Sequence, residues 1–221
     1  MFFQTTVMGD PNIGMYGFAT SAYALLGTKT KSVKEMEQAL RVPVFTAPVI
    51  NTWLTGLFLA GNATGIVAPF VVKRDVEKLQ EHVKQIHLVD GVFTALGNLV
   101  LMNDHGIILS PLLHRHQQEF SSFFGIPCET TMIAGQRMVG SLAIANNHGC
   151  LAHPHIKPEE QTIIEQILNV DVLMGTVSYG SFYPHVGLIA NDHGCVASDT
   201  TTGFELGQVL EALKLRDTKD A

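Results

Sequence analysis

The chain repeats one short sequence unit five times along its length. The tetrapeptide NDHG occupies Asn103 to Gly106 and again Asn191 to Gly194, and NNHG occupies Asn146 to Gly149. A further copy is anchored at Asn62 and a weaker one at Thr20, so the anchors recur at intervals of 42, 41, 43 and 45 residues. A repeat of this size is typical of folds in which each unit packs only against its neighbours.

Local signals within each copy predict the unit ββαβ. Two apolar segments flank a polar turn that ends on Gly, which indicates a β-hairpin. A stretch with helical periodicity follows, and a short β-branched segment comes after each of the first four helices. The expected helices span Ser32 to Arg41, Lys73 to Val83, His114 to Phe124, Pro158 to Leu168 and Thr202 to Leu213. The expected third strands are Arg41 to Phe45, Ile86 to Val89, Ile126 to Glu129 and Val170 to Met174. Capping boxes are expected at Ser32 with Glu35 and at Thr202 with Glu205.

Five units of this kind predict a closed ring. A helix and three short strands cannot bury their apolar faces alone, so neighbouring units must pack together. We therefore expect an α/β fold, a closed five-bladed pseudo-symmetric propeller with its helices outside and its strands around an axis. The repeats are placed at about residues 1–45, 46–90, 91–132, 133–176 and 177–215 of a single domain. A flexible tail is expected over residues 216–221.

Composition argues against several classes of function. The chain has 20 acidic and 14 basic residues, a balance that disfavours binding nucleic acid chiefly through its phosphates or encircling it as a clamp. No secretory signal or membrane-length apolar segment is visible, and three cysteines without a CxxC pair fit reduced thiols. We therefore expect a cytoplasmic protein without membrane contact. The motifs GxxxxGK[ST], GxSxG and HExxH are not present, and no cofactor is expected.

The repeated histidines and cysteines have a chemical and a structural interpretation. His105, His148 and His193 could supply three ligands to Zn²⁺. Recurrence at one structural position is what duplication produces, however, and turns spread around a rim would not converge on one ion. We interpret them as scaffold and expect no metal. Cys150 and Cys195 follow the same turns in apolar surroundings and are interpreted as core residues, and Asn at the anchor is interpreted as a turn former.

The repeat Gly marks a predicted binding surface. This Gly opens the first strand at the same place in each copy, so the residues around it should gather near the pseudo-symmetry axis on one face. Trp53 and Arg137 lie three residues before it in the second and fourth units. Trp and Arg are enriched at interface hot spots, although Trp53 could also serve packing between units.

The segments TALGNLVLMNDHGIILSP, GSLAIANNHGCLAHP, MGTVSYGS and ANDHGCVASDTTTGFELGQVLEALKL closely resemble the archaeal and eukaryotic translation initiation factor 6 family. The resemblance covers almost the whole chain and is most specific from Ala47 to Leu215. It implies the pentein fold and a non-enzymatic protein that binds the intersubunit face of the large ribosomal subunit. There the factor would block joining of the small subunit by docking on a ribosomal protein next to the sarcin-ricin loop. A role in large-subunit maturation and a minor contact with rRNA stay open, and a monomer is expected.

The resemblance also implies which residues dock. In this family the docking face surrounds the repeat Gly and the residue after it. The matching positions are Gly14, Leu57, Asn98 and Ser141, to which the hot-spot argument adds Arg137. Asn98 is the strongest of these, whereas Leu57 departs from the Arg of eukaryotic members. In the fifth unit His185 occupies the Gly position.

A rival interpretation is an enzyme. Guanidine-modifying hydrolases and transferases share the pentein architecture and use a nucleophilic Cys with His and acidic partners from different units. Cys195 would be the nucleophile here, although its equivalence to Cys150 argues against a unique role.

Overall fold

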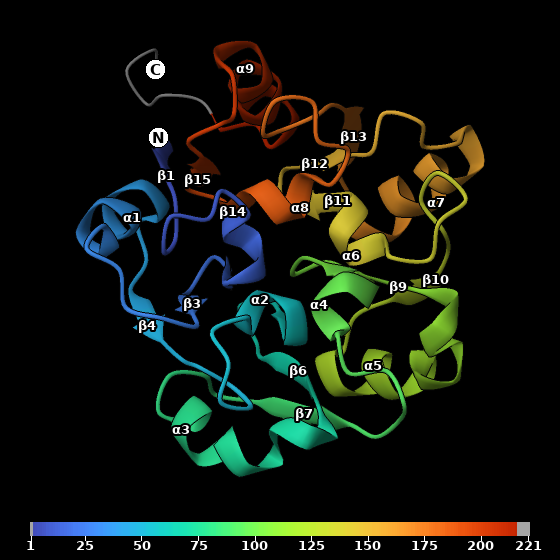
Figure 1. Cartoon of the computed structure of the whole chain (residues 1–221). Coiled ribbons are helices and arrows are strands. Elements are labelled where there is room, and N and C mark those ends of the chain that lie inside the picture. The colour runs from blue at the N-terminus through green and yellow to red at the C-terminus, as the bar shows by residue number, and fades with distance from the viewer. Residues whose placement is uncertain (1, 216–221) are drawn as a thin grey trace.

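A computed structural model describes residues 2–215 as five three-stranded sheets arranged around a central axis (Figure 1). The first strands, which line the axis, are β2 (Gly17–Ala19), β5 (Ala60–Gly61), β8 (Val100–Met102), β11 (Ala143–Ala145) and β14 (Leu188–Ala190). The second strands are β3 (Ala24–Leu26), β6 (Ile66–Pro69), β9 (Ile107–Leu109), β12 (Gly149–Ala152) and β15 (Cys195–Ser198). The third strands are β4 (Val44–Thr46), β7 (Ile86–Val89), β10 (Cys128–Thr130), β13 (Asp171–Met174) and β1 (Phe2–Thr5). The arrangement confirms the expected α/β fold with fivefold pseudo-symmetry. The expected flexible tail, 216–221, lies outside the described residues.

Every sheet follows the same pairing rule. The first and second strands are antiparallel, as a hairpin requires, and the third strand lies parallel to the second. A parallel partner needs a crossover, and the outer helix of each of the first four units supplies it.

The N-terminal strand closes the ring. β1 pairs in parallel with β15, with Phe2 opposite Cys195 and Thr5 opposite Ser198. No third strand is predicted after the fifth helix, and the structure takes that strand from the other end of the chain. The first and last units are thereby joined by backbone hydrogen bonds.

The outer helices lie close to their predicted spans. They are α1 (Val33–Leu40), α3 (Val76–Gln80), α5 (Gln117–Phe124), α7 (Pro158–Leu168) and α9 (Gly203–Ala212), and short 3₁₀ helices η2 (Phe70–Asp75) and η3 (Pro111–His116) precede α3 and α5. The capping box of Thr202 and Glu205 is confirmed. The one expected at Ser32 is wrong, because Ser32 has φ −89° and ψ 14° where a capping residue needs extended backbone, and its side chain makes no capping bond.

Each unit adds one further element to the expected ββαβ order, a helix of about one turn before the first strand. These helices are η1 (Ile13–Met15), α2 (Thr55–Phe58), α4 (Leu96–Leu99), α6 (Val139–Leu142) and α8 (Pro184–Gly187). The repeat Gly lies inside this turn, so the expectation that it opens the first strand is wrong. Elements of three or four residues are too short to create a periodic apolar pattern.

The core consists of five apolar clusters, each shared by two neighbouring units. Leu101 of the third unit packs with Leu142 and Ile164 of the fourth, and Val196 of the fifth packs with Leu40 of the first. The outer helices lie at these same junctions, as α7 does against β9 and β10. The expectation that units are stabilised by their neighbours is confirmed.

Across residues 2–215, no helix combines the length and the apolar character needed to cross a membrane.

Candidate docking face at the axis

The short helices surround the axis on one face of the ring (Figure 1). In the second, third and fourth units, the glycine of the short helix packs against the backbone of the corresponding glycine in the preceding unit. A Cβ atom on Gly56 would clash with the carbonyl oxygen of Gly14, one on Gly97 with that of Gly56, and one on Gly140 with that of Gly97. Because only Gly lacks the Cβ atom, the repeat Gly is required by this close approach of backbones.

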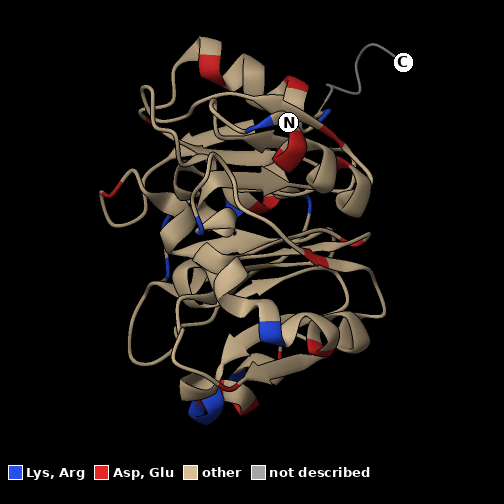
Figure 2. Cartoon of the chain, turned by 90° about the vertical axis from the view of Figure 1, so that its right-hand side faces the viewer, with Lys and Arg blue, Asp and Glu red and all other residues tan. Residues whose placement is uncertain are grey.

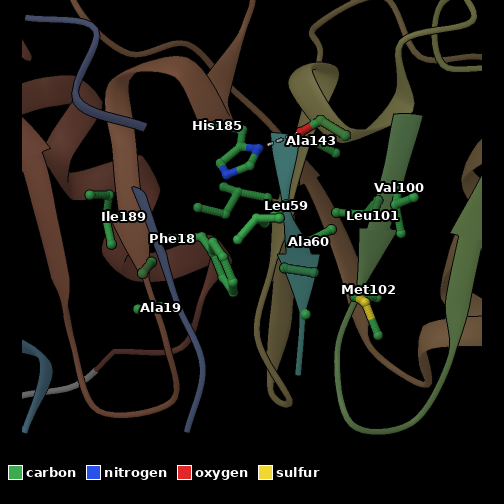
Figure 3. A pocket seen from close by; sticks show the side chains of 15 residues that line it. Phe18, Ala19, Leu59, Ala60, Val100, Leu101, Met102, Ala143, His185 and Ile189 are labelled. Atoms are coloured by element: carbon green, nitrogen blue, oxygen red, sulfur yellow. Dashed lines mark hydrogen bonds between the residues drawn. The ribbon is translucent and has the colours of Figure 1, made fainter. Parts of the chain in front are cut away.

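His185 takes the place of Gly in the fifth unit and closes the circle with its side chain. Its Nδ1 lies 2.7 Å from the carbonyl oxygen of Gly140 and donates to it. Figure 3 shows the imidazole projecting towards the axis above Phe18 and Leu59. Burial lowers the pKa of His185, which the hydrogen bond to Gly140 opposes, and the neutral imidazole is the favoured form. The only sequence signal for this role is the break in the Gly pattern.

Below His185 lies an axial cavity of about 50 Å³, lined mainly by the first strands of all five units (Figure 3). Its lining is apolar, with side chains such as Phe18, Leu59, Leu101 and Ile189. Among the lining residues, His185 alone has an ionisable side chain, and none is a Cys, Asp or Glu. A cavity of this composition lacks the nucleophile and the acid that a hydrolase would need at its centre.

On its outer side, His185 borders a shallow depression that opens on the docking face. Gly14, Leu57, Asn98 and Ser141 all line this depression. Asn98 Oδ1 accepts a hydrogen bond of 2.7 Å from the Ser141 hydroxyl. The structure thus brings four predicted docking residues together, and their part in binding stays a prediction.

Arg137, the fifth predicted residue, is exposed in the turn before α6 and does not line the depression. Four such turns, closed by bridges such as that between Ile133 and Gln136, surround the depression. The turns and the residues after them expose large apolar side chains, with fractional exposures of 56% at Met8, 53% at Trp53, 41% at Met138 and 84% at Tyr179. Val92, Phe93, Phe182 and Tyr183 are exposed on the equivalent links of the third and fifth units.

Buried carboxylates hold these turns in place. Glu205 caps α9 by accepting from the Thr202 N–H, and it also accepts from the N–H groups of Tyr179 at 3.2 Å and Gly180 at 2.7 Å. Burial alone would raise the pKa of Glu205, but the hydrogen bonds from Thr202, Gly180 and the Thr176 hydroxyl lower it. The ionised carboxylate therefore positions the exposed Tyr179 turn.

The same device recurs in two other units. The buried Glu160 accepts from the Ala134 N–H at 2.7 Å, and the half-buried Asp75 accepts from the Ile50 N–H at 2.9 Å. Ala134 and Ile50 both have positive φ, which a non-glycine residue adopts only when its surroundings impose it. The projecting turns are thus built into the scaffold.

The docking face has few charges. In the segments 7–15, 49–58, 90–98, 132–141 and 177–186, all of them described, Asp10, Asp90 and Arg137 are the only Asp, Glu, Lys or Arg residues. Asp10 accepts a 2.9 Å hydrogen bond from the Tyr16 hydroxyl. Figure 2 shows the remaining charged positions distributed over outer helices and loops.

At the opposite end of the axis the anchor asparagines form a second ring. Asn146 Oδ1 accepts from the N–H groups of His148 and Gly149, which confirms its turn-forming role. Its Nδ2 donates to the carbonyl oxygens of Asn191 at 3.0 Å and Leu213 at 2.9 Å in the next unit. In the same way, the Nδ2 of Asn62, Asn103 and Asn191 donates to the carbonyl oxygen of the anchor residue in the next unit. In the first unit, whose anchor is Thr20, the Tyr23 hydroxyl donates to the Asn62 carbonyl oxygen instead. This cross-unit role was not predicted.

The histidines of these turns are exposed, and within residues 2–215 no three His, Cys, Asp or Glu side chains form a group suited to hold a metal ion. The expectation that the turns are spread around a rim is wrong. They meet through the residue after each anchor, since Asn147 Nδ2 lies 2.6 Å from Asp104 Oδ2 and 2.8 Å from Asp192 Oδ2. The reason is that the first strands enclose only a narrow axial space.

Cys150 and Cys195 are fully buried, and burial raises the pKa of each thiol to about 12. The prediction that they are core residues is confirmed. A nucleophilic Cys needs a lowered pKa and an adjacent base, whereas His193 is exposed at the surface. The geometry around Cys195 therefore does not support the enzyme interpretation.

Comparison with known proteins gives a consistent result. A model described as the eIF-6 family matches residues 2–212. A protein named Translation initiation factor 6 from Pyrococcus abyssi is 31% identical over 216 residues, covering 93% of this chain and 95% of the relative. A protein of the same name from Pyrococcus horikoshii is 32% identical over 214 residues, covering 92% of this chain and 94% of the relative. A third, from Thermococcus onnurineus, is 31% identical over 220 residues, covering 94% of this chain and 96% of the relative.

Proposed function

The chain belongs to the eIF-6 family of translation factors, and we propose that it binds the large ribosomal subunit at its intersubunit face and prevents association with the small subunit. The contact is made by the docking face at the axis, on a ribosomal protein next to the sarcin-ricin loop. The protein acts as a monomer in the cytoplasm. A factor bound there before the subunits join is also available for a role in large-subunit maturation.

The observation that supports this proposal is the character of the docking face. Exposed Trp53, Met138 and Tyr179 surround a depression with few nearby charges. Aromatic residues and Met are enriched, and charges depleted, at the centre of protein–protein interfaces, whereas a phosphate-binding face needs clustered cations. A protein surface is therefore the partner that this face fits best.

The mechanism is steric exclusion and requires no bond to be made or broken. A factor that binds one subunit where the other must land removes that subunit from the association equilibrium by mass action. A rigid body blocks more effectively than a flexible one, and this ring is held by the β1–β15 pairing at one junction and by hydrogen bonds between units.

Sedimentation in sucrose gradients tests the proposal. The purified protein should migrate with large subunits and should reduce the fraction of joined ribosomes when small subunits are added. Leu57→Asp places a charge in the depression and should weaken binding by tenfold or more, because an interface would have to desolvate it. Phe2→Asp is the matched control, since Phe2 is exposed at the start of β1, opposite Cys195 and towards the other end of the axis. Equal binding by the two variants, or no effect of the wild-type protein on joining, would contradict the proposal.

A further inference from the structure

A ring with fivefold pseudo-symmetry can meet a partner in five rotational registers, so an asymmetric feature must select one. The basic residues are distributed asymmetrically. Lys29 and Lys31 follow β3 in the first unit, and Lys73 and Arg74 lie in η2, which follows β6 in the second. The equivalent segments of the third and fourth units, 110–116 and 153–157, have one Lys or Arg each, and that of the fifth unit, 199–202, has none. In Figure 2 one group of Lys and Arg positions lies at the lower end, the level of α3 in Figure 1, and further ones lie at mid-height and near the top.

These basic loops lie on either side of the turn that carries Trp53. Gly27 packs so closely against Trp53 that a Cβ atom would clash with the Trp53 carbonyl oxygen, which places the loop of Lys29 beside this turn. On the other side, the Asp75 carboxylate accepts from the Ile50 N–H and ties η2 to the same turn. A surface hollow of about 460 Å³ lies between this turn and η2, lined by Ile50, Asn51, Phe70, Val71, Lys73, Arg74 and Asp75.

The chemistry of this surface combines unpaired cations with exposed aromatic rings. Lys29, Lys31, Lys73 and Arg74 are exposed, and none forms a salt bridge with a carboxylate of the described chain. Trp53 is 53% and Phe70 48% exposed, and Lys73 Nζ lies 5.2 Å from the centre of the Phe70 ring. Cations that neutralise phosphates, interleaved with rings on which bases stack, are the features that bind single-stranded RNA.

We propose that Lys29, Lys31, Trp53, Phe70, Lys73 and Arg74 bind a single-stranded or looped segment of RNA, and that this contact sets the rotational register in which the axial face docks. The proposal rests on the proposed function, because the RNA would belong to the large subunit. The axial face supplies apolar contact with protein, and the basic-aromatic surface supplies orientation. The two contacts differ in salt dependence, since only the second releases counterions from phosphates.

Co-sedimentation with purified large subunits at salt concentrations from about 50 to 200 mM provides the first test. The double variant Lys73→Ala with Arg74→Ala should bind large subunits more weakly at low salt. It should also make the slope of log affinity against log salt concentration shallower by about 1.4, because each of the two lost phosphate contacts contributes about 0.7 to that slope. Arg41→Ala with Lys84→Ala is the control, because it removes the same charge from exposed residues that precede β4 and β7 at the opposite end of the ring. Equal slopes for the two double variants would overturn the RNA contact and leave the proposed function intact. Failure of the wild-type protein to sediment with large subunits would overturn both.

Two further measurements separate RNA from a protein partner. A fluorescent 12-nucleotide single-stranded RNA should bind the wild-type protein, and Trp53→Ala with Phe70→Ala should weaken that binding by about tenfold or more with little change in the salt slope. Phe70→p-azidophenylalanine should cross-link to rRNA on illumination of the complex with large subunits. Cross-links confined to ribosomal protein, or equal binding of the oligonucleotide by wild type and both double variants, would overturn the proposal.

Discussion

Replacing Asn146 by Ala should reveal how strongly the ring of anchor asparagines holds neighbouring units together. The Asn146 side chain is 4% exposed and takes part in four hydrogen bonds. Two are accepted from the N–H groups of its own turn at 2.9 Å, and two are donated to carbonyl oxygens of the fifth unit at 3.0 and 2.9 Å. Alanine removes all four and leaves two N–H groups and two carbonyl oxygens of the backbone without these bonds.

The magnitude follows from these contacts. A typical intramolecular hydrogen bond contributes about 0.5–1.5 kcal/mol net, so four predict a loss of about 2–6 kcal/mol, and we expect about 4 kcal/mol. In a protein of this size each kcal/mol lowers Tm by about 2–4 °C, which predicts a decrease of about 8–16 °C. Asn62→Ala should cost about 1 kcal/mol less, since Asn62 makes a single cross-unit bond, of 3.2 Å, and has no counterpart of the bond to Leu213.

Urea unfolding followed by circular dichroism gives the free energies, and calorimetry gives Tm. If the slope of unfolding free energy against urea concentration is the same for Asn146→Ala, Asn62→Ala and wild type, the two variants differ from wild type in stability alone. Asn146→Asp is the diagnostic variant. Its carboxylate can still accept the two hydrogen bonds of the turn, but it places a negative oxygen, in place of the donor Nδ2, against the carbonyl oxygens of Asn191 and Leu213. It should be at least as destabilised as Asn146→Ala at pH 7. A loss below about 1 kcal/mol for Asn146→Ala, or tolerance of Asn146→Asp, would refute the view that these side chains join the units.

Three further predictions concern single residues. Gly97→Ala should destabilise the protein by on the order of 3 kcal/mol in urea unfolding, because the added Cβ atom would overlap the backbone of the preceding unit. Gly207→Ala is the control: Gly207 lies in a helix with open space around it, so this variant should be more stable than wild type by about 0.5–1 kcal/mol. Since hydrogen bonds lower the folded-state pKa of Glu205, its contribution to stability should be complete above about pH 4.3 and lost as the pH falls through the folded-state pKa. Acid titration of stability should therefore be shallower for Glu205→Gln than for wild type. The Cys195 thiol should stay unreactive towards a disulfide reagent at pH 8 until the protein is denatured, and rapid reaction in the native state would revive the enzyme interpretation.

The candidate site was predictable in part. The periodic Gly placed Gly14, Leu57, Asn98 and Ser141 at one location, and the structure does bring them together. His185 is different, because its side chain reaches Gly140 across 45 positions of the chain, and only a break in the Gly pattern marked it. The carboxylates that hold the projecting turns were equally hidden, since a capping Glu has the same sequence signature whether or not it also reaches a neighbouring turn.

Local sequence determined the repeat, the order of hairpin, helix and third strand, and the resemblance to a family of translation factors, because hydrophobic periodicity, turn chemistry and caps act over a few residues. Tertiary structure alone decided that β1 completes the fifth sheet and that the Asn191 side chain reaches the carbonyl oxygen of Thr20, 171 positions away. It also decided which loops meet Trp53 to form the basic-aromatic surface. These contacts join residues that are distant along the chain, and their partners become neighbours only when the ring closes.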